Sequence, residues 1–264
     1  MIPFNDSTRK LGCRPSPFDP RRIMLSRFLP LPDLEPPPYE ADFTSKVTLP
    51  WGLYANDTVG DCVLATAAHT DMVRTGNRGH LFVPSTASVI KAYSDITGYD
   101  PSKTALDGSN PTDQGTDPED ALKYRRQTGI AGNKIGAYGG INPQDMQRIK
   151  QVINLLECAE FSLALPYAAG DLTDWVLPAG QSPTDVWAAG TWGGHSVPAV
   201  SYSPDWLYFV SWGKIYRANW RFALTYAVRV DGVVAEDMLD ITTGRAPNGM
   251  DIVGLKSALE WATA

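Results

Sequence analysis

The stretch NDTVGDCVLATAAHT, residues 56–70, places a cysteine where a polar loop changes into an alanine-rich run. Alanine favours helix and Gly76 is a stop signal, so the pattern predicts a helix over residues 61–76 with Cys62 in its first turn. A helix N-terminus lowers the pKa of a thiol, and Gly60 allows the backbone to bend closely around the sulfur. The stretch therefore indicates either a cysteine nucleophile or a small buried residue that begins a helix.

The composition of the chain is ordinary for a globular protein. It has 264 residues, of which 43% are hydrophobic and 20% charged, with a net charge of −6. An acidic balance gives no reason to expect nucleic acid or an anionic membrane as a partner. No apolar run approaches the roughly 20 residues of a membrane span, and the first residues lack the apolar core of a signal peptide. We therefore expect a protein that is cytoplasmic when it is synthesised.

Helical patterns come first along the chain and strand patterns follow. Helices are predicted over residues 61–76, 84–98, 117–129, 142–160 and, at the end of the chain, 250–264. Strands are predicted over residues 159–167, on both sides of the turn SPDW at 203–206, and over 221–230. The glycine-rich segment GAYGGIN, residues 136–142, is predicted to be a flexible connector. The order indicates an α+β protein with a helical half and an antiparallel sheet half.

The N-terminal arm, residues 1–45, is rich in proline and contains the triplet Pro36–Pro38. Such triplets favour extended polyproline conformation. The segment RRIMLSRFL, residues 21–29, is apolar enough to pack on a neighbouring surface. We therefore expect an extended arm that lies across the globular part of the molecule.

The three cysteines are Cys13, Cys62 and Cys158, and no two of them form a CxxC pair. A zinc ribbon and a thioredoxin motif are thereby excluded, and a disulfide framework is not expected in a chain of this size without a secretion signal. Cys158 falls in a predicted amphipathic helix and is assigned to packing, whereas Cys13 lies in the arm, a position open to solvent. A metal site that joins Cys62 to His69 is rejected because seven helical residues separate them by about 10.5 Å. We expect no metal and no cofactor.

A thiol nucleophile needs a base and an oxyanion donor, and the chain offers candidates for both. His69 lies two helical turns from Cys62 and cannot reach the sulfur, and His80 lies in a loop between helices. His195 follows two glycines and precedes a strand, a position where the backbone of a substrate can pass. Asn56 places an amide in the loop before Cys62.

The blocks VTLPWGLYANDTVGDCVLATAA (47–68) and GGHSVPAVSYSPDWLYFVSWG (193–213) resemble the papain-like cysteine peptidase family, and the resemblance covers roughly residues 40–230. It implies a two-lobe fold, with the cysteine on the central helix of a helical left lobe and the histidine in an antiparallel β-sheet or barrel right lobe. The papain-like domain would span 46–235, with lobes at about 46–135 and 136–235. A C-terminal extension, 236–264, would end in a helix.

The resemblance also implies roles for single residues. Cys62 would be the nucleophile and His195 the base, and Asn56 stands where the family has an oxyanion glutamine. Trp212 would shield the partner of the histidine from water, and it would line the substrate cleft.

Two glycines complete the expected cleft. Gly115 falls near the glycine-rich wall that the family has in its substrate cleft, and Gly194 would lie beside a bound substrate.

One part of the family's triad is missing from its expected place. The asparagine that orients the histidine corresponds to Val210, which has no hydrogen-bonding side chain. Ser211 is the nearest polar neighbour, but on a strand it faces the other way from Val210. The sequence does not identify another residue that orients His195.

Two functions therefore stay open. The first is a cysteine peptidase or hydrolase that acts on a peptide or other acyl substrate through a Cys62 thioester. The second is a catalytically silent papain-fold protein, an accessory in a larger assembly such as a phage virion (capsid or tail decoration). The variant NDTVGDC resembles bacterial and phage-encoded chains, and the arm and the C-terminal helix suit docking onto protein neighbours.

Overall fold

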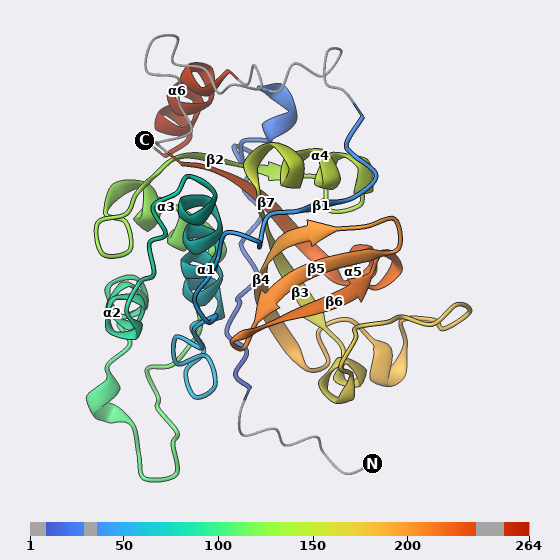
Figure 1. The fold of residues 1–264 in the computed structure, drawn as a ribbon. Helices are drawn as coiled ribbons and strands as arrows, with labels where there is room; N and C mark the ends of the chain where they lie inside the picture. Colours follow the sequence, from blue (N-terminus) through green and yellow to red (C-terminus); the bar gives the residue numbers. More distant parts are fainter. Residues whose placement is uncertain (1–8, 29–35, 236–250, 264) are drawn as a thin grey trace.

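The computed structural model describes residues 9–28, 36–235 and 251–263. Three helices form one side of the molecule and a twisted sheet forms the other (Figure 1). The helices of the first side are α1 (Cys62–Asn77), α2 (Thr86–Thr97) and α3 (Pro118–Gln127). None of the helices in these ranges is long and apolar enough to cross a membrane.

The sheet is antiparallel throughout, with the strand order β2-β7-β3-β4-β5-β6, and a short strand β1 pairs with β4. Its strands are β1 (Ala41–Asp42), β2 (Ile135–Ile141), β3 (Ala159–Leu165), β4 (Gly193–Tyr202), β5 (Trp206–Ser211), β6 (Lys214–Asn219) and β7 (Ala227–Ala235). A helical half followed by an antiparallel sheet is the predicted α+β class, which is confirmed.

Three further helices and four short 3-10 turns complete the described structure. The helices are α4 (Met146–Leu156), α5 (Trp220–Tyr226) and α6 (Ile252–Thr263). The turns are η1 (Leu25–Arg27), η2 (Pro101–Lys103), η3 (Tyr167–Asp171) and η4 (Asp185–Trp187). Helix α4 packs on the sheet, and α6 packs against β2 at the edge farthest from β6.

The helix ends follow local sequence signals. The hydroxyl of Ser85 accepts a hydrogen bond from the backbone N–H of Ser88 at 3.1 Å, which caps α2. The carboxylate of Asp117 accepts from the N–H of Glu119 at the start of α3. Gly98 ends α2 in the left-handed conformation at φ 77°. These caps explain why the predicted helices are found within a few residues of their expected bounds.

Two predictions about the sheet half are wrong. The residues 221–230, predicted as one strand, form α5 and only the beginning of β7. Asn219 caps α5 by accepting from the N–H of Phe222, and the helix buries the aromatic side chains of Phe222 and Tyr226. Tertiary burial therefore outweighs the strand propensity of the segment.

The segment predicted as a flexible connector, residues 136–142, belongs to the fully buried strand β2 up to Ile141, and only Asn142 lies outside it. Its glycines allow the arm to approach. A Cβ on Gly139 would lie 2.9 Å from the side chain of Leu25, and the N–H of Gly140 donates to the carbonyl of Ile23 at 2.8 Å. Glycine here provides room for a neighbouring chain segment and not flexibility.

The arm contributes to both hydrophobic cores. Ile23 and Leu25 lie in the core of the sheet half, as expected from the apolar segment 21–29, and Cys13 lies in the core of the helical half. In Figure 1 the described part of the arm runs between α1 and the sheet. The arm is thus a structural part of the interface between the two halves.

Four buried charged side chains also connect the two halves. They are Asp71, Arg74, Arg125 and Glu160, and we call them the interlobe ion cluster. Arg125 of α3 binds Glu160 of β3 at 2.7 Å and Asp71 of α1 at 3.4 Å, and Arg74 binds Asp71 at 2.5 Å. The side chains of Asp71, Arg74 and Arg125 are each 1% exposed, and that of Glu160 is 11% exposed. The cluster fixes the helix that begins at Cys62 relative to the sheet.

Candidate active site

Cys62 is the first residue of α1 and is 1% exposed. The backbone N–H groups of Ser196 and Gly12 point toward its sulfur and favour the thiolate. Burial has the larger effect and raises the pKa of the Cys62 thiol well above its ordinary value. In this state the sulfur is therefore a neutral thiol, placed beside the strand that carries His195.

His195 lies in β4 and is 1% exposed. Its Nε2 is 2.7 Å from the hydroxyl of Ser211, and the ring of Trp212 stacks on the imidazole with centroids 4.4 Å apart. Burial lowers the pKa of His195 to about 3, so the ring is neutral near pH 7. Its Nδ1 is buried and has no hydrogen-bond partner among the described residues, so no bond to Cys62 is formed in this state.

Ser211 is the partner of His195 that the sequence left unidentified. Val210 packs in a buried apolar cluster with Val73, Cys158 and Val200. The next residue on the strand faces the opposite side, as predicted, and that side carries His195. The hydrogen-bonding partner of the histidine therefore lies one residue after Val210, on the opposite face of the strand.

Asn56 lies in the loop before α1 and is 2% exposed. Its side-chain amide donates to the backbone carbonyl of Val59 at 3.0 Å, and the backbone carbonyl of Asn56 accepts from the N–H of Lys10. The amide thus stabilises the loop in this state. Its role as an oxyanion donor stays a prediction.

Asp61 is a feature that the sequence reasoning did not single out. It is the residue before Cys62 and is fully buried, and burial raises the pKa of its carboxyl well above the ordinary value. Burial therefore disfavours the ionised form of this carboxyl, which adjoins the candidate nucleophile. The motif GDC contains this residue, but nothing in it distinguishes a buried carboxyl from an exposed cap.

The N-terminal arm occupies the cleft between the two halves. The N–H of Cys13 donates to the carbonyl of Gly194 at 3.1 Å on one side. On the other side the N–H of Thr116 donates to the carbonyl of Gly12 at 2.7 Å, and the N–H of Arg14 donates to the carbonyl of Thr116 at 2.9 Å. Residues 12–14 are therefore bound as an extended strand, the way in which peptides add to an exposed backbone edge.

The predicted cleft residues are the ones that contact the arm. A Cβ on Gly115 would lie 2.3 Å from the carbonyl oxygen of Gly12, and one on Gly194 would lie 1.9 Å from that of Cys13. The indole N–H of Trp212 donates to the carbonyl of Lys10 at 3.4 Å. The structure thus brings Gly115, Gly194 and Trp212 together around one extended peptide segment, which is part of this chain.

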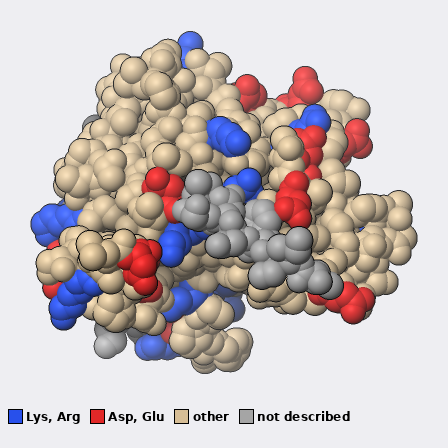
Figure 2. All heavy atoms as spheres, turned by 90° about the horizontal axis from the view of Figure 1, so that it is seen from below, with Lys and Arg blue, Asp and Glu red and all other residues tan. Residues whose placement is uncertain are grey.

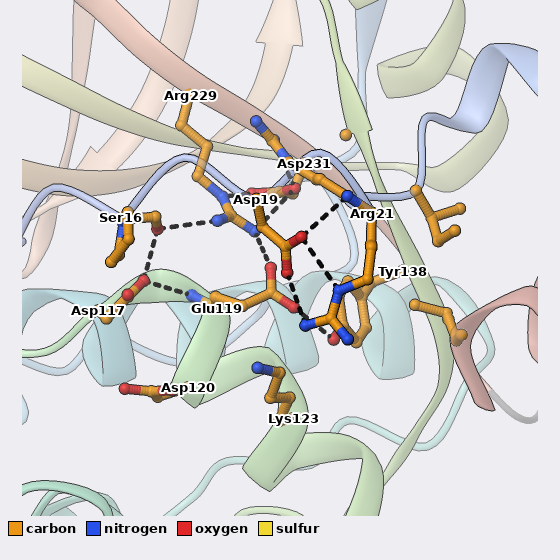
Figure 3. A pocket seen from close by; sticks show the side chains of 15 residues that line it. Ser16, Asp19, Arg21, Asp117, Glu119, Asp120, Lys123, Tyr138, Arg229 and Asp231 are labelled. Atoms are coloured by element: carbon orange, nitrogen blue, oxygen red, sulfur yellow. Dashed lines mark hydrogen bonds and ion pairs between the residues drawn. The ribbon is translucent and has the colours of Figure 1, made fainter. Parts of the chain in front are cut away.

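Polar contacts anchor the arm beyond the cleft, around a hollow of about 310 Å³ (Figure 3). Arg22 binds Asp231 of β7 at 2.9 Å, and the hydroxyl of Ser16 donates to Asp117 at 2.5 Å. Arg229 of β7 donates to Ser16 and binds Glu119 of α3 at 2.7 Å. The arm therefore joins α3 to β7 through charged groups that are only partly exposed.

Of the other cysteines and histidines, only Cys13 lies close to the candidate site. Cys158 is buried after α4, in agreement with a packing role, and His69 binds the carbonyl of Gly52 at 2.8 Å. His80 lies exposed between helices. Cys13 is 8% exposed, so the expectation of an accessible thiol is wrong, because the arm turns this residue into the core of the helical half.

Charge on the surface follows no single sign. On the face drawn in Figure 2, lysine and arginine side chains alternate with aspartate and glutamate among uncharged residues. Among the described residues, no group of three or more histidine, cysteine and acidic side chains is arranged to hold a metal ion.

Comparison with solved structures identifies the architecture. Xylellain, a cysteine protease from Xylella fastidiosa, matches with a TM-score of 0.62 at 12% identity, over 89% of this chain and 99% of that one. Digestive procathepsin L 3 of Tenebrio molitor matches with a TM-score of 0.57 at 12% identity, over 87% and 77% of the two chains. ProCathepsin B S9 from Trypanosoma congolense gives 0.53 at 10% identity, over 88% of each chain.

No family model and no curated protein matches the sequence. The likeness thus lies in the arrangement of helices and strands, which places a cysteine at the start of the central helix opposite a histidine in the sheet. The chain has the fold of the papain-like cysteine proteases.

Proposed function

We propose that this protein is a cysteine hydrolase of the papain-like type, held in a closed state by its own N-terminal arm. One observation carries the proposal. The thiol of Cys62 lies beside the strand of His195 at the start of a helix, and the hydroxyl of Ser211 holds the imidazole by Nε2. This leaves Nδ1 as the ring nitrogen available to take a proton.

The chemistry of the open state follows from these atoms. Displacement of the arm removes the burial that keeps Cys62 neutral, and Nδ1 of His195 then accepts the thiol proton. The thiolate attacks the acyl carbon of a substrate and forms a thioester, the protonated histidine gives its proton to the leaving group, and water hydrolyses the thioester. The backbone N–H groups in the first turn of α1 suit stabilisation of the oxyanion.

The arm supports a peptide as the substrate class. Its residues 12–14 bind between Thr116 and Gly194 through backbone hydrogen bonds, which a substrate of any side-chain sequence can make. Two of the three matched structures named above are proforms by their names, a procathepsin L and a proCathepsin B. A closed state of this kind is consistent with a precursor that awaits removal or release of its arm.

A silent papain-fold protein is the second candidate, and the covered cleft favours it. With Cys62 and His195 each 1% exposed, no substrate reaches the sulfur in this state. If the arm never leaves, the fold serves only as a scaffold, as in an accessory component of a virion or another assembly. Its partners would be protein neighbours at the arm and at α6.

Labelling with a thiol-directed epoxide separates the two functions. The full chain and a variant without residues 1–14, which retains the core residues Ile23 and Leu25, are treated across pH and analysed by peptide mass spectrometry. We expect Cys62 to label fastest in the shortened chain and to support hydrolysis of a peptide substrate that Cys62→Ala abolishes. A shortened chain that keeps its circular dichroism but neither labels Cys62 faster than Cys158 nor hydrolyses peptides would contradict a hydrolase.

A further inference from the structure

The arm brings a second thiol into the candidate site. The backbone of Cys13 is held by its N–H, which donates to the carbonyl of Gly194, the residue before His195. Gly12, one residue earlier, lies against the backbone of Gly60, close to the start of α1. Cys13 and Cys62 then belong to the same buried apolar cluster.

The surroundings of the two sulfurs place them over neighbouring positions of the sheet. The side chain of Cys13 hydrogen-bonds with that of Ser162 on β3, and the backbone N–H of Ser196 on β4 points toward the sulfur of Cys62. Ser162 and Ser196 are direct cross-strand partners. Residues in that relation have Cβ atoms about 5 Å apart. The backbone N–H of Gly12, the residue before Cys13, also points toward the Cys62 sulfur, so the two cysteines lie near each other.

The electrostatic effect of Cys13 on the pKa of Cys62 agrees with this geometry. A negative charge on Cys13 raises the pKa of Cys62, second only to the effect of burial. Burial also raises the pKa of Cys13, to about 11. Both thiols are thus unreactive while the arm is fully seated, and both gain reactivity together when the arm loosens.

We propose that Cys13 and Cys62 form a reversible disulfide that locks the arm covalently in the cleft. A low-molecular-weight disulfide, such as oxidised glutathione, is the oxidant. The Cys62 thiolate attacks it and releases one glutathione thiol, and Cys13 then attacks the Cys62 sulfur and releases the second. Two protein thiols are oxidised, one glutathione disulfide is reduced, and the two protons end on the released thiols.

The lock itself needs no catalytic activity. Its consequence rests on the proposed hydrolase function: under oxidising conditions the enzyme has no free nucleophile, and a reductant restores its activity. Cys158 provides an internal reference, because it is equally buried but lies in a different cluster with Val73, Val200 and Val210.

Non-reducing peptide mapping of the full chain tests the disulfide. After treatment with excess oxidised glutathione, we expect one cross-linked peptide pair that contains Cys13 and Cys62, with a mass about 2 Da below the sum of its parts and sensitive to dithiothreitol. Cys13→Ser should abolish the cross-link and leave glutathione on Cys62. The matched variant Cys158→Ser should keep it.

A chain that stays reduced, carries only mixed disulfides with glutathione, or cross-links through Cys158 would overturn the proposal. Hydrolysis of a peptide substrate by the shortened chain without residues 1–14, which lacks Cys13, is measured separately. A cross-link in the full chain, without hydrolysis by the shortened chain, refutes the hydrolase and keeps the disulfide. Hydrolysis by the shortened chain, without a cross-link in the full chain, refutes the disulfide and keeps the hydrolase.

Discussion

The interlobe ion cluster and the thiol–imidazole pair at the cleft are both buried, but they are buried in different ways. In the ion cluster each charge faces an opposite charge, as Arg125 faces Glu160 and Asp71. In the cleft, Cys62 and His195 have no opposite charge to stabilise an ionised form. Burial therefore raises the pKa of the thiol and lowers that of the imidazole to about 3.

The difference lies in what covers each group. The ion cluster is enclosed by α1, α3 and β3, elements of the two halves themselves. The cleft pair is covered by the arm, through the contacts of residues 10–14. The first arrangement holds the halves together permanently, whereas the second suppresses a reactive pair only while one segment stays in place.

The largest expected effect comes from breaking the ion cluster. Arg125→Ala leaves the carboxylates of Asp71 and Glu160 buried with one partner fewer, and we expect a loss of about 3–5 kcal/mol in the free energy of unfolding. Chemical denaturation measures this loss.

The neighbouring Arg126 provides the control, because it pairs at 3.6 Å with Glu260, whose side chain is 73% exposed. Arg126→Ala should change the free energy of unfolding by less than about 1 kcal/mol. Equal losses for the two variants would show that the buried cluster contributes no more than a surface pair.

The second prediction opens the cleft and leaves the side chains of Cys62 and His195 unchanged. In Gly12→Val the new Cβ would lie 1.8 Å from the carbonyl oxygen of Gly60, so the arm has to move. Overpacking of this kind costs about 1–3 kcal/mol, and we expect alkylation of Cys62 to accelerate by roughly tenfold to a hundredfold.

Phe18→Ala is the matched arm variant, because Phe18 is 92% exposed. Its rate of Cys62 alkylation should equal that of the unaltered chain. If Gly12→Val alkylates at that same rate, the arm does not protect the thiol.

The contrast also explains which features the sequence predicts. The helices follow from local caps such as Ser85 and Asp117, and the two-lobe fold follows from motifs in a fixed order. The strand β2 and the helix α5 were predicted wrongly, because their conformation depends on packing against distant segments. Local sequence patterns do not predict that the side chain of Leu25 lies over Gly139.

The candidate site divides in the same way. Cys62 and His195 are recognisable from motifs, and the cleft glycines are recognisable with them. The place of Cys13 depends on hydrogen bonds to residues about 100 and 180 positions away, which no local pattern encodes. Ser211 was missed for a smaller reason, since strand alternation identifies it once the position of His195 is known.

The third prediction concerns pH. His195 has a pKa of about 3 under the arm, and an exposed histidine has a pKa near 6.5. As pH falls below about 6.5, the open state binds a proton that the closed state does not bind, so the closed state loses stability down to about pH 3. The backbone N–H of Cys13, which donates to Gly194, should therefore exchange faster at lower pH. After correction for the intrinsic exchange rate, we expect an increase of up to about tenfold for each pH unit of acidification.

Two histidine variants test the assignment of this effect. His195→Gln should make the corrected exchange of the Cys13 amide independent of pH between 6.5 and 5. His69, whose pKa burial lowers to about 4, contacts Gly52 and the rings of Trp51 and Tyr54. His69→Gln should therefore leave the dependence in place, and its disappearance in that variant would reassign the effect.

The smallest effect tests how the imidazole is held. Ser211→Ala removes the hydrogen bond to Nε2 of His195, which contributes about 0.5–1.5 kcal/mol, so the turnover of the shortened chain should fall by roughly two- to tenfold. Ser196→Ala is the control, because that residue offers its backbone N–H to the site.

Val210→Asn, which restores the family's residue type, should not raise turnover, since the amide would enter the apolar cluster of Val73 and Val200 and destabilise the fold. A gain of activity in Val210→Asn would mean that the histidine is oriented from Val210 in the open state and from Ser211 only under the arm.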